Sequence, residues 1–432
     1  MKSNMSDNVG VSDLKKRIFF VVLILFIYRM GSHVPVPFLD VKQILNSFSE
    51  ENVGIFSLFN LFSGGALSKV TIFSLGVMPY ISASIIVQLL AAVWEPMKKL
   101  RKEGDIGRRK ISDYTRYLSV FLSTIQAIAM SKYLLSLSGL GSIIFLHYLV
   151  VIITLVSGTL FLVWLGEQIN EKGIGNGISL IIFTSIVSNI PRSIGSSLDK
   201  LRQGEINIFA MFIFLVVLVL IVFFIVFVER AQRKILVNYA KRQQGRRMFA
   251  AQTTYLPLKI NMSGVIPPIF ASSVVLFPIT LMQWFDQASG SMFFYNLKSM
   301  LLPGKPLYIF LFGVAIIFFC FFYTNLVFNS KETADNLKRS GGFIPGIRPG
   351  SQTSVYIDKI VNKLTLIGAL YLTFVSLLPE FLVLFADIPF YFGGTSLLIV
   401  VVVIMDFISQ VQTKLISYKY DGLMKKYNLK SF

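Results

Sequence analysis

The chain has few of the residues on which disulfides and metal centres depend. Its 432 residues include one cysteine and two histidines. Cys320 lies in an apolar run, and His33 and His147 are far apart in the sequence. The sequence therefore predicts no disulfide framework, no metal site and no bound cofactor.

Charge is also scarce. Charged residues form 15% of the chain and hydrophobic residues 54%, whereas soluble globular proteins carry about 25% charged residues. The sequence therefore indicates a membrane protein.

Ten apolar runs are long enough to consider as membrane spans. They cover residues 18–37, 73–93, 114–132, 145–165, 176–191, 207–228, 260–284, 307–328, 362–379 and 388–409.

Half of these runs contain no side chain that is charged at neutral pH. Runs 73–93, 145–165, 207–228, 260–284 and 307–328 have no Asp, Glu, Lys or Arg. Ion-coupled transporters usually keep an ionisable residue near the middle of the membrane. The sequence also lacks the His-Glu-x-x-His and Gly-x-Ser-x-Gly motifs of metalloproteases and serine hydrolases. Ion-coupled transport and catalysis are both disfavoured.

The basic residues orient the chain. With the N-terminus placed in the cytoplasm, 32 of the 41 lysines and arginines fall in segments on the cytoplasmic side. This bias follows the positive-inside rule, so both termini are predicted to be cytoplasmic.

Ten spans suggest two halves of five with inverted topology. We expect an all-α polytopic membrane protein with halves at residues 1–195 and 196–432.

One segment predicts an enclosed pathway. The short apolar piece 55–62 is broken by Ser63, Gly64 and Gly65 and precedes the full span 73–93. Non-helical backbone at membrane depth is tolerated only where protein buries it or where it lines a water-filled cavity. We expect a short re-entrant helix beside a channel, although a surface loop is an equally good interpretation of this feature alone.

Two cytoplasmic loops are long and internally patterned. Loop 229–259 has strand-like composition around Ile235–Tyr239, and its Gln-Gln-Gly-Arg-Arg run predicts a hairpin tip. In loop 329–363, a short helix is expected with Ser330 as its N-cap and Gly341 just after its end. Basic loops of this kind fit a polyanion such as ribosomal RNA or an acidic protein surface. The alternative is that their charges only set topology and contact lipid headgroups.

At this level of detail the chain resembles the bacterial SecY family of protein-translocation channels. The resemblance covers nearly everything from Leu14 to Leu429 and rests on long motifs in the family's order. They include LFNLFSGGALSK, GVMPYISASIIVQLL, WLGEQINEKGIGNGISLIIF, FVERAQRKILVNYAKRQQGRR, LPLKINMSGVIPPIFASS, FNSKETADNLKRSGGFIPGIRPG and PFYFGGTSLLIVVVVIMDF.

The resemblance implies a passive protein-conducting pore that also opens sideways into lipid. A plug helix would occupy 56–69, with Phe56, Leu58, Phe59, Asn60, Phe62, Ser63, Gly64 and Gly65. An aliphatic pore ring would consist of Val77, Ile81, Ile178, Ile182, Ile269 and Ile399. A lateral gate would include Ser82, Gln88, Asn261 and Phe277, whose polar members would bond across the seam or only to their own backbone. Motor and ribosome docking would fall on Arg230, Arg242, Arg246, Arg247 and Arg348.

The resemblance also implies partners. These are small subunits of the SecE and SecG type, the SecA motor, the ribosome, signal peptides, precursor proteins and membrane lipids. The location would be the bacterial inner membrane. Energy must come from those partners, because the chain lacks a phosphate-binding Gly-x-x-x-x-Gly-Lys-[Ser/Thr] loop. A secondary transporter for a neutral solute and a membrane-bound assembly scaffold are the alternatives.

Overall fold

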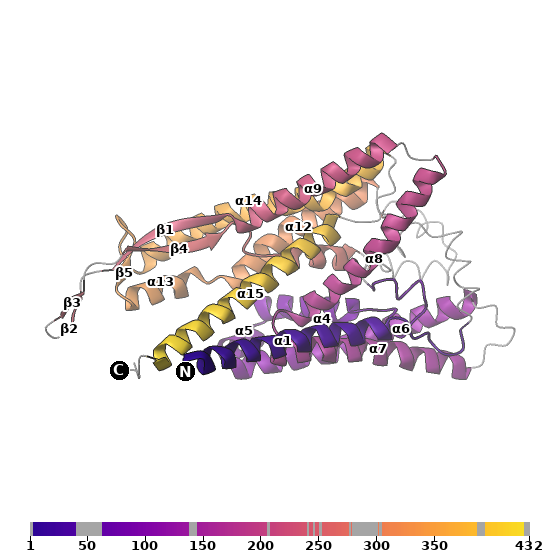
Figure 1. Ribbon diagram of the computed structural model, residues 1–432, viewed down its shortest axis with the longest axis horizontal. Helices are drawn as coiled ribbons and strands as arrows, with labels where there is room; N and C mark the ends of the chain where they lie inside the picture. Colours follow the sequence, from indigo (N-terminus) through magenta and orange to yellow (C-terminus); the bar gives the residue numbers. More distant parts are fainter. Residues whose placement is uncertain are drawn as a thin grey trace. The chain divides into compact units, whose positions relative to one another are not determined.

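The computed structural model is mostly helical (Figure 1). It describes residues 3–39, 63–137, 145–204, 208–239, 242–244, 247–249, 253–275, 278, 301, 305–386 and 394–426. The helices are α1 (Ser3–Gly31), α4 (Met78–Val93), α5 (Glu95–Lys102), α6 (Asp105–Leu137), α7 (Phe145–Lys172), α8 (Gly177–Arg202), α9 (Ile208–Arg230), α12 (Pro306–Val327), α13 (Ser330–Arg339), α14 (Ser351–Ala386) and α15 (Gly394–Lys426). The strands are β1 (Gln232–Tyr239), β2 (Arg242–Gln244), β3 (Arg247–Phe249), β4 (Thr253–Lys259) and β5 (Gly342–Phe343). A shorter apolar helix covers Ile266–Val275.

The predicted spans correspond to these helices. Among the described residues, seven helices are long and apolar enough to cross a membrane, and the α4–α5 pair makes an eighth if counted as one span bent by 95°. The other two predicted runs overlap α1 and the helix Ile266–Val275. Each of the ten apolar runs therefore overlaps a described helix.

Several predicted boundaries differ from the ends of the helices, and two of the differences involve prolines. The second run begins at residue 73, but α4 begins at Met78, where Pro79 occupies its first turn. Proline suits that position because its missing N–H has no helical partner there. The fifth run was expected to end at Pro191, but α8 continues through this proline to Arg202. A proline inside a membrane helix is tolerated when neighbouring groups satisfy the freed backbone.

The structure divides into two compact units. Unit 1 comprises residues 1–205, 276–303 and 399–432, and unit 2 comprises 206–275 and 304–398. In unit 1, α4 packs on α6, α6 on α7, and α7 on α8 and α1. Its buried cluster includes Val36, Val70, Leu134 and Leu155.

The two ends of the chain also meet within unit 1. The Tyr418 hydroxyl of α15 donates a hydrogen bond to the Asp13 carboxylate of α1, and Arg17 donates to the same oxygen. Both bonds lower the pKa of the Asp13 carboxyl below its ordinary value, and the bond from Tyr418 has the larger effect.

Unit 2 carries a three-stranded sheet of order β4-β1-β5 beside its helices. Strand β1 pairs antiparallel with β4, with Ile235 opposite Leu256. Alternate side chains of β1 are buried, because successive residues of a strand point to opposite faces. Ile235 therefore belongs to the same hydrophobic cluster as Ile357 and Val361 of α14.

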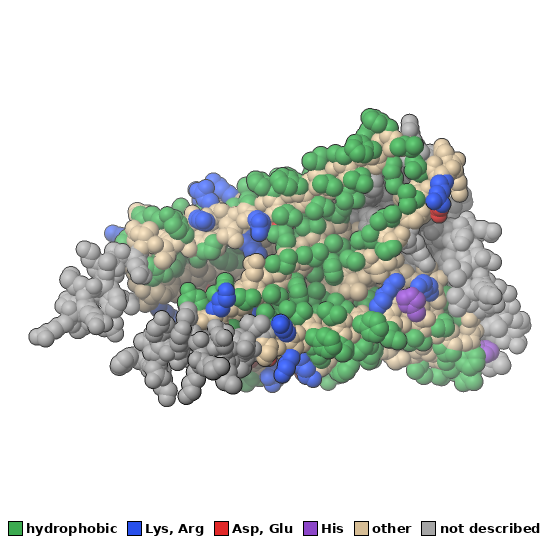
Figure 2. All heavy atoms as spheres, viewed as in Figure 1, with side chains coloured by type: hydrophobic (Ala, Val, Ile, Leu, Met, Phe, Trp, Pro, Cys, Tyr) green, Lys and Arg blue, Asp and Glu red, His purple; other side chains and the backbone are tan. Residues whose placement is uncertain are grey.

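Much of the exposed helical surface is apolar. Figure 2 shows hydrophobic side chains over the visible faces of the helices, with lysine and arginine gathered near helix ends. Along α9 the large side chains are exposed, for example Phe212, Val219 and Phe223. An exposed face of this composition suits contact with lipid rather than water.

Candidate pore, plug segment and cytoplasmic loops

Residues 63–77, which begin inside the predicted plug segment 56–69, form a compact, mostly buried block that leads to α4. The side chains of Thr71 and Ser74 both donate to the Ala66 carbonyl, at 3.2 Å. The block also pairs with the end of the first span, because the Val36 amide donates to the Val70 carbonyl at 2.9 Å. Backbone groups that a helix would satisfy internally are thus paired with other parts of the chain.

Two close approaches fix this block against neighbouring helices. At Gly158 of α7, an added Cβ would lie 2.1 Å from the Ile72 carbonyl oxygen. At Gly31, the end of α1, it would lie 2.3 Å from the Phe73 ring. Only glycine leaves room for the Ile72 backbone at the first position and for the Phe73 ring at the second. The non-helical segment is therefore held in place by α1 and α7.

Only part of the predicted plug is described. Phe56, Leu58, Phe59, Asn60 and Phe62 lie outside the described residues. Ser63, Gly64 and Gly65 are buried, and both glycines have positive φ, at 70° and 80°. The glycines therefore serve a turn inside the predicted plug segment, since an L side chain rarely adopts this conformation.

Most predicted pore-ring residues are buried aliphatic side chains of unit 1. Val77 immediately precedes α4, and the Ile81 amide of α4 donates to its carbonyl. Ile182 of α8 and Ile399 of α15 are buried, whereas Ile178 is half-buried. Ile269 is buried in unit 2, on the helix Ile266–Val275. Their convergence into one ring stays a prediction, because burial is equally expected of ordinary core residues.

A tight turn positions the start of α8, which carries Ile178 and Ile182. The Gly177 amide donates to the Asn170 side chain at 2.7 Å, and an added Cβ at Gly177 would lie 1.9 Å from the Gly166 carbonyl oxygen. The Gly175 amide donates to the Gln410 side chain of α15 at 3.0 Å. The glycine-rich turn thus ties α8 closely to α7 and α15.

The predicted gate residues make local contacts in this structure. The Gln88 side-chain amide donates to Ser84 of the same helix at 2.9 Å, and its carbonyl oxygen has no hydrogen-bond partner among the described residues. Ser82 is half-buried on α4, and Phe277 lies outside the described part of the chain. Their roles in a lateral gate stay predictions.

Asn261 is the centre of a polar network inside unit 2. Its side-chain amide donates to the buried carboxylate of Glu229 at 2.6 Å and to the Gly264 carbonyl at 3.1 Å. Its side-chain oxygen accepts from Ser263 and from the Gly264 amide. These bonds fasten the end of α9 to the turn before the helix Ile266–Val275. A gate role for Asn261 also stays a prediction.

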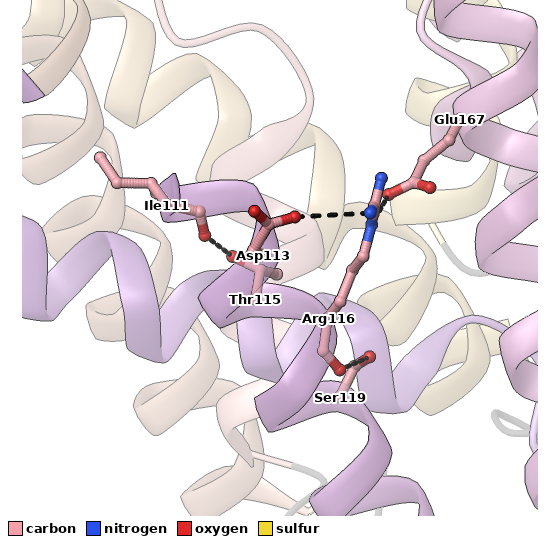
Figure 3. Close-up of polar contacts among 6 residues, drawn as sticks. All are labelled: Ile111, Asp113, Thr115, Arg116, Ser119 and Glu167. Carbon is pink, nitrogen blue, oxygen red and sulfur yellow. Dashed lines mark hydrogen bonds and ion pairs between the residues drawn. The ribbon is translucent and has the colours of Figure 1, made fainter. Parts of the chain in front are cut away.

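An ion pair joins two helices of unit 1, as Figure 3 shows. Arg116 Nε of α6 lies 2.6 Å from Glu167 Oε1 of α7. Asp113 approaches the same guanidinium at 3.4 Å. The hydroxyl of Ser119 donates to the Arg116 carbonyl within α6. The pair therefore adds a charged contact to the apolar packing between α6 and α7.

Loop 229–259 contains the predicted strands. β2 and β3 pair antiparallel with Gln244 opposite Arg247, as the predicted hairpin requires. In Figure 1 this small hairpin lies beyond the end of the β1–β4 ribbon. Arg242 belongs to β2, Arg230 is exposed at the end of α9, and Arg246 lies outside the described residues.

The second loop contains the predicted helix, α13, but its N-cap was misassigned. Asn329 is the N-cap, and its side chain accepts from the Glu332 amide at 3.3 Å. Ser330 is the first helical residue, and its hydroxyl bonds instead to Asp358 of α14. Gly341 follows the helix with φ 73°, as predicted. Arg348 is exposed in the turn beyond it.

The predicted site residues did not include several side chains that contact the plug segment. Tyr28 and Arg29 of α1 and Ser185 and Ser188 of α8 bond to each other or to the peptides of Ser63 and Gly64. One signal was available in the sequence, since a charged residue inside a membrane span marks a functional site by default. The serines carried no comparable signal.

Comparison with solved structures defines the class of fold. A structure described as a protein-conducting channel matches 94% of this chain and 93% of its own, with a TM-score of 0.66 at 17% identity. A SecY structure, whose plug domain is described as stabilising the closed state, matches the same shares with a TM-score of 0.68 at 18% identity. The chain therefore has the fold of these channels, and the predicted ten-span, all-α class is confirmed.

Sequence comparison defines the family. The SecY family model matches residues 71–408. The protein translocase subunit SecY of Vibrio cholerae is 54% identical over 98% of this chain and 96% of its own length. The corresponding subunits of Pseudomonas aeruginosa and Escherichia coli K12 are 55% and 52% identical, with the same shares covered. This chain belongs to the SecY family, so the predicted resemblance is confirmed.

Proposed function

We propose that this chain is the channel-forming subunit of a bacterial protein translocase. Unfolded precursor polypeptides cross the membrane through it, and hydrophobic segments leave it sideways into lipid. The main support is sequence identity: this chain is 52–55% identical, over nearly their full length, to relatives called protein translocase subunit SecY.

The pore chemistry supports a passive channel. The proposed constriction is formed by aliphatic side chains, Val77, Ile81, Ile178, Ile182, Ile269 and Ile399. A hydrophobic constriction gates ions by dewetting and offers no charge or strong donor to hold a passing side chain. It therefore suits a pore that conducts many different sequences.

Sealing and lateral exit complete the proposal. Residues 56–69 would act as the plug of the resting channel, and residues 63–69 of this segment belong to the buried block that α1 and α7 hold. Ser82, Gln88, Asn261 and Phe277 would contribute to the lateral gate. The Gln88 carbonyl oxygen, buried on α4 without a described partner, supports a role that needs an acceptor in another conformation.

Partners supply the energy and complete the complex. We infer that the chain assembles with subunits of the SecE and SecG type, and that SecA or a ribosome docks on loops 229–259 and 329–363. The exposed Arg230 and Arg348 support docking on these loops. Relatives of the same fold were solved in ribosome complexes, one canine and one from yeast. The bias of lysine and arginine supports an inner-membrane location with both termini in the cytoplasm.

Reconstitution tests this proposal. The chain is placed in lipid vesicles with its small subunits, and an unfolded precursor is added with SecA and ATP. We expect protease-protected precursor only when chain, motor and ATP are all present. A gradient-driven uptake of small neutral solutes, without precursor protection, would instead identify a secondary transporter and overturn the proposal.

A further inference from the structure

Arg29 places a positive charge in the otherwise apolar part of α1. The preceding residues 18–28 contain no ionisable group except Tyr28. A charged side chain at such a position is costly and is retained where it has a specific partner. Within the described part of the chain, that partner is not a carboxylate: the guanidinium donates to the Gly64 carbonyl at 3.2 Å and to the Ser32 hydroxyl at 3.4 Å.

The Gly64 carbonyl accepts from a second element as well. The Ser188 hydroxyl of α8 lies 3.3 Å from this oxygen and shares its one proton with the Ser185 carbonyl, at 2.8 Å. A carbonyl oxygen has two lone pairs, so the Gly64 carbonyl can accept from Arg29 and Ser188 together. The plug segment is thereby bonded at one atom to two helices, α1 and α8.

The neighbouring peptide is held in the same way. The buried Tyr28 hydroxyl donates to the Ser63 carbonyl at 3.3 Å and also bonds to Ser185 of α8. Gly64 has φ 70°, and a Cβ there would lie 3.0 Å from Ser185 Cα. The backbone of Ser63 and Gly64 therefore fits closely between α1 and α8, with little room for another conformation.

We propose that Arg29 is a positioning residue that anchors the plug segment, at its Ser63–Gly64 turn, to α1 and α8 through the Gly64 carbonyl. This inference rests on the proposed sealing role of residues 56–69. A charge-assisted bond is about twice as strong as a neutral one, and the site is partly withdrawn from water. Arg29 is thus the strongest single attachment of the Ser63–Gly64 turn, and losing it frees the segment that seals the resting channel.

The test measures resting ion conductance of the reconstituted complex in planar bilayers. Arg29→Gln keeps a donor but removes the charge, and we expect the leak to rise about ten-fold. Arg29→Lys should restore most of the seal, because the charge and a donor return. Ser188→Ala should raise the leak by a smaller factor. Ser196→Ala is the matched control, since that hydroxyl bonds within α8 to the Ser193 carbonyl and its loss should leave the leak unchanged.

A chain that lacks residues 56–62 distinguishes a wrong proposal about the Arg29 anchor from a wrong proposal about the plug. Deleting residues 56–62 should raise the leak by itself; an unchanged leak would refute the sealing role. If the deletion leaks but Arg29→Gln does not, the anchor is refuted and the plug stands. In the deleted chain Arg29→Gln should add nothing, and a further increase would mean that Arg29 acts elsewhere. If Arg29→Gln fails to accumulate, Tyr28→Phe and Ser188→Ala serve instead, and a normal seal in both overturns the inference.

Discussion

Arg116 Nε lies 2.6 Å from Glu167 Oε1, and this contact joins α6 to α7. The two side chains differ in exposure, 47% for Arg116 and 18% for Glu167. The carboxylate is therefore the member that depends on its partner. A buried charge left alone costs more than an exposed one, because water cannot replace the lost partner.

This difference in exposure predicts that alanine substitution at the two positions lowers stability by different amounts. Arg116→Ala leaves Glu167 largely buried without its closest cation and should destabilise the protein by about 1–3 kcal/mol. Glu167→Ala leaves Arg116 half-exposed beside Asp113 and should cost less than about 1 kcal/mol. Unfolding in detergent measures both, with Asp113→Asn as the control. Equal losses for the two alanine variants would contradict this account.

A second prediction concerns the close approach at Gly158. Gly158→Ala would place a methyl group 2.1 Å from the Ile72 carbonyl oxygen, so the block 63–77 must move away from α7. We expect a loss of more than about 2 kcal/mol in stability, read by thermal unfolding in detergent. Gly195→Ala is the matched helical control, because nothing lies within 4 Å of its added Cβ. A similar loss in both variants would show that the contact with Ile72 is not the cause, because alanine by itself favours a helix over glycine.

The proposed pore ring predicts a distinction between polar and aliphatic replacements. Ile81→Asn or Ile182→Asn should wet the constriction, raise resting ion conductance and admit precursors with defective signal sequences. Ile81→Leu and Ile182→Leu keep the surface apolar and should change little. Conductance and precursor transport are measured on the same reconstituted samples. The dewetting account fails if asparagine and leucine behave alike.

The exposed Arg348 separates partner docking from topology. Reversing one of the 32 basic residues predicted on the cytoplasmic side should not change orientation, so Arg348→Glu is expected to keep normal abundance and protease-mapped topology. If the turn contacts the motor, SecA-driven precursor transport should nevertheless fall at least about ten-fold. Lys331→Glu, an exposed charge reversal in the same loop, is the control. Normal transport by Arg348→Glu would leave this arginine with a topological role only.

Charge reversals at Arg242 and Arg247 test the other loop. If the β2–β3 hairpin contacts ribosomal RNA, both reversals should weaken ribosome binding. The affinity of the unaltered chain should fall steeply with salt, because phosphate contacts release counterions. Binding is measured across a salt series by co-sedimentation. Affinity that is independent of salt and of both arginines would contradict RNA docking at this hairpin.

The sequence by itself determined the features that depend on contiguous residues. Apolar runs predict membrane helices because partition into lipid is summed along one segment. The strand-like composition around Ile235 and the turn residues after Gln244 predicted strands and a hairpin, because residue composition and turn chemistry are local properties. The long motifs likewise identified the family without any coordinates.

Tertiary structure decided which of several possible partners each polar group takes. Ser330 and Asn329 are both good N-caps, and the contact between Ser330 and Asp358 of α14 left the cap to Asn329. The Gly64 carbonyl meets Arg29, 35 residues earlier, and Ser188, 124 residues later. No periodicity encodes such a pairing, because it exists only once the chain has folded and left those groups no water with which to bond.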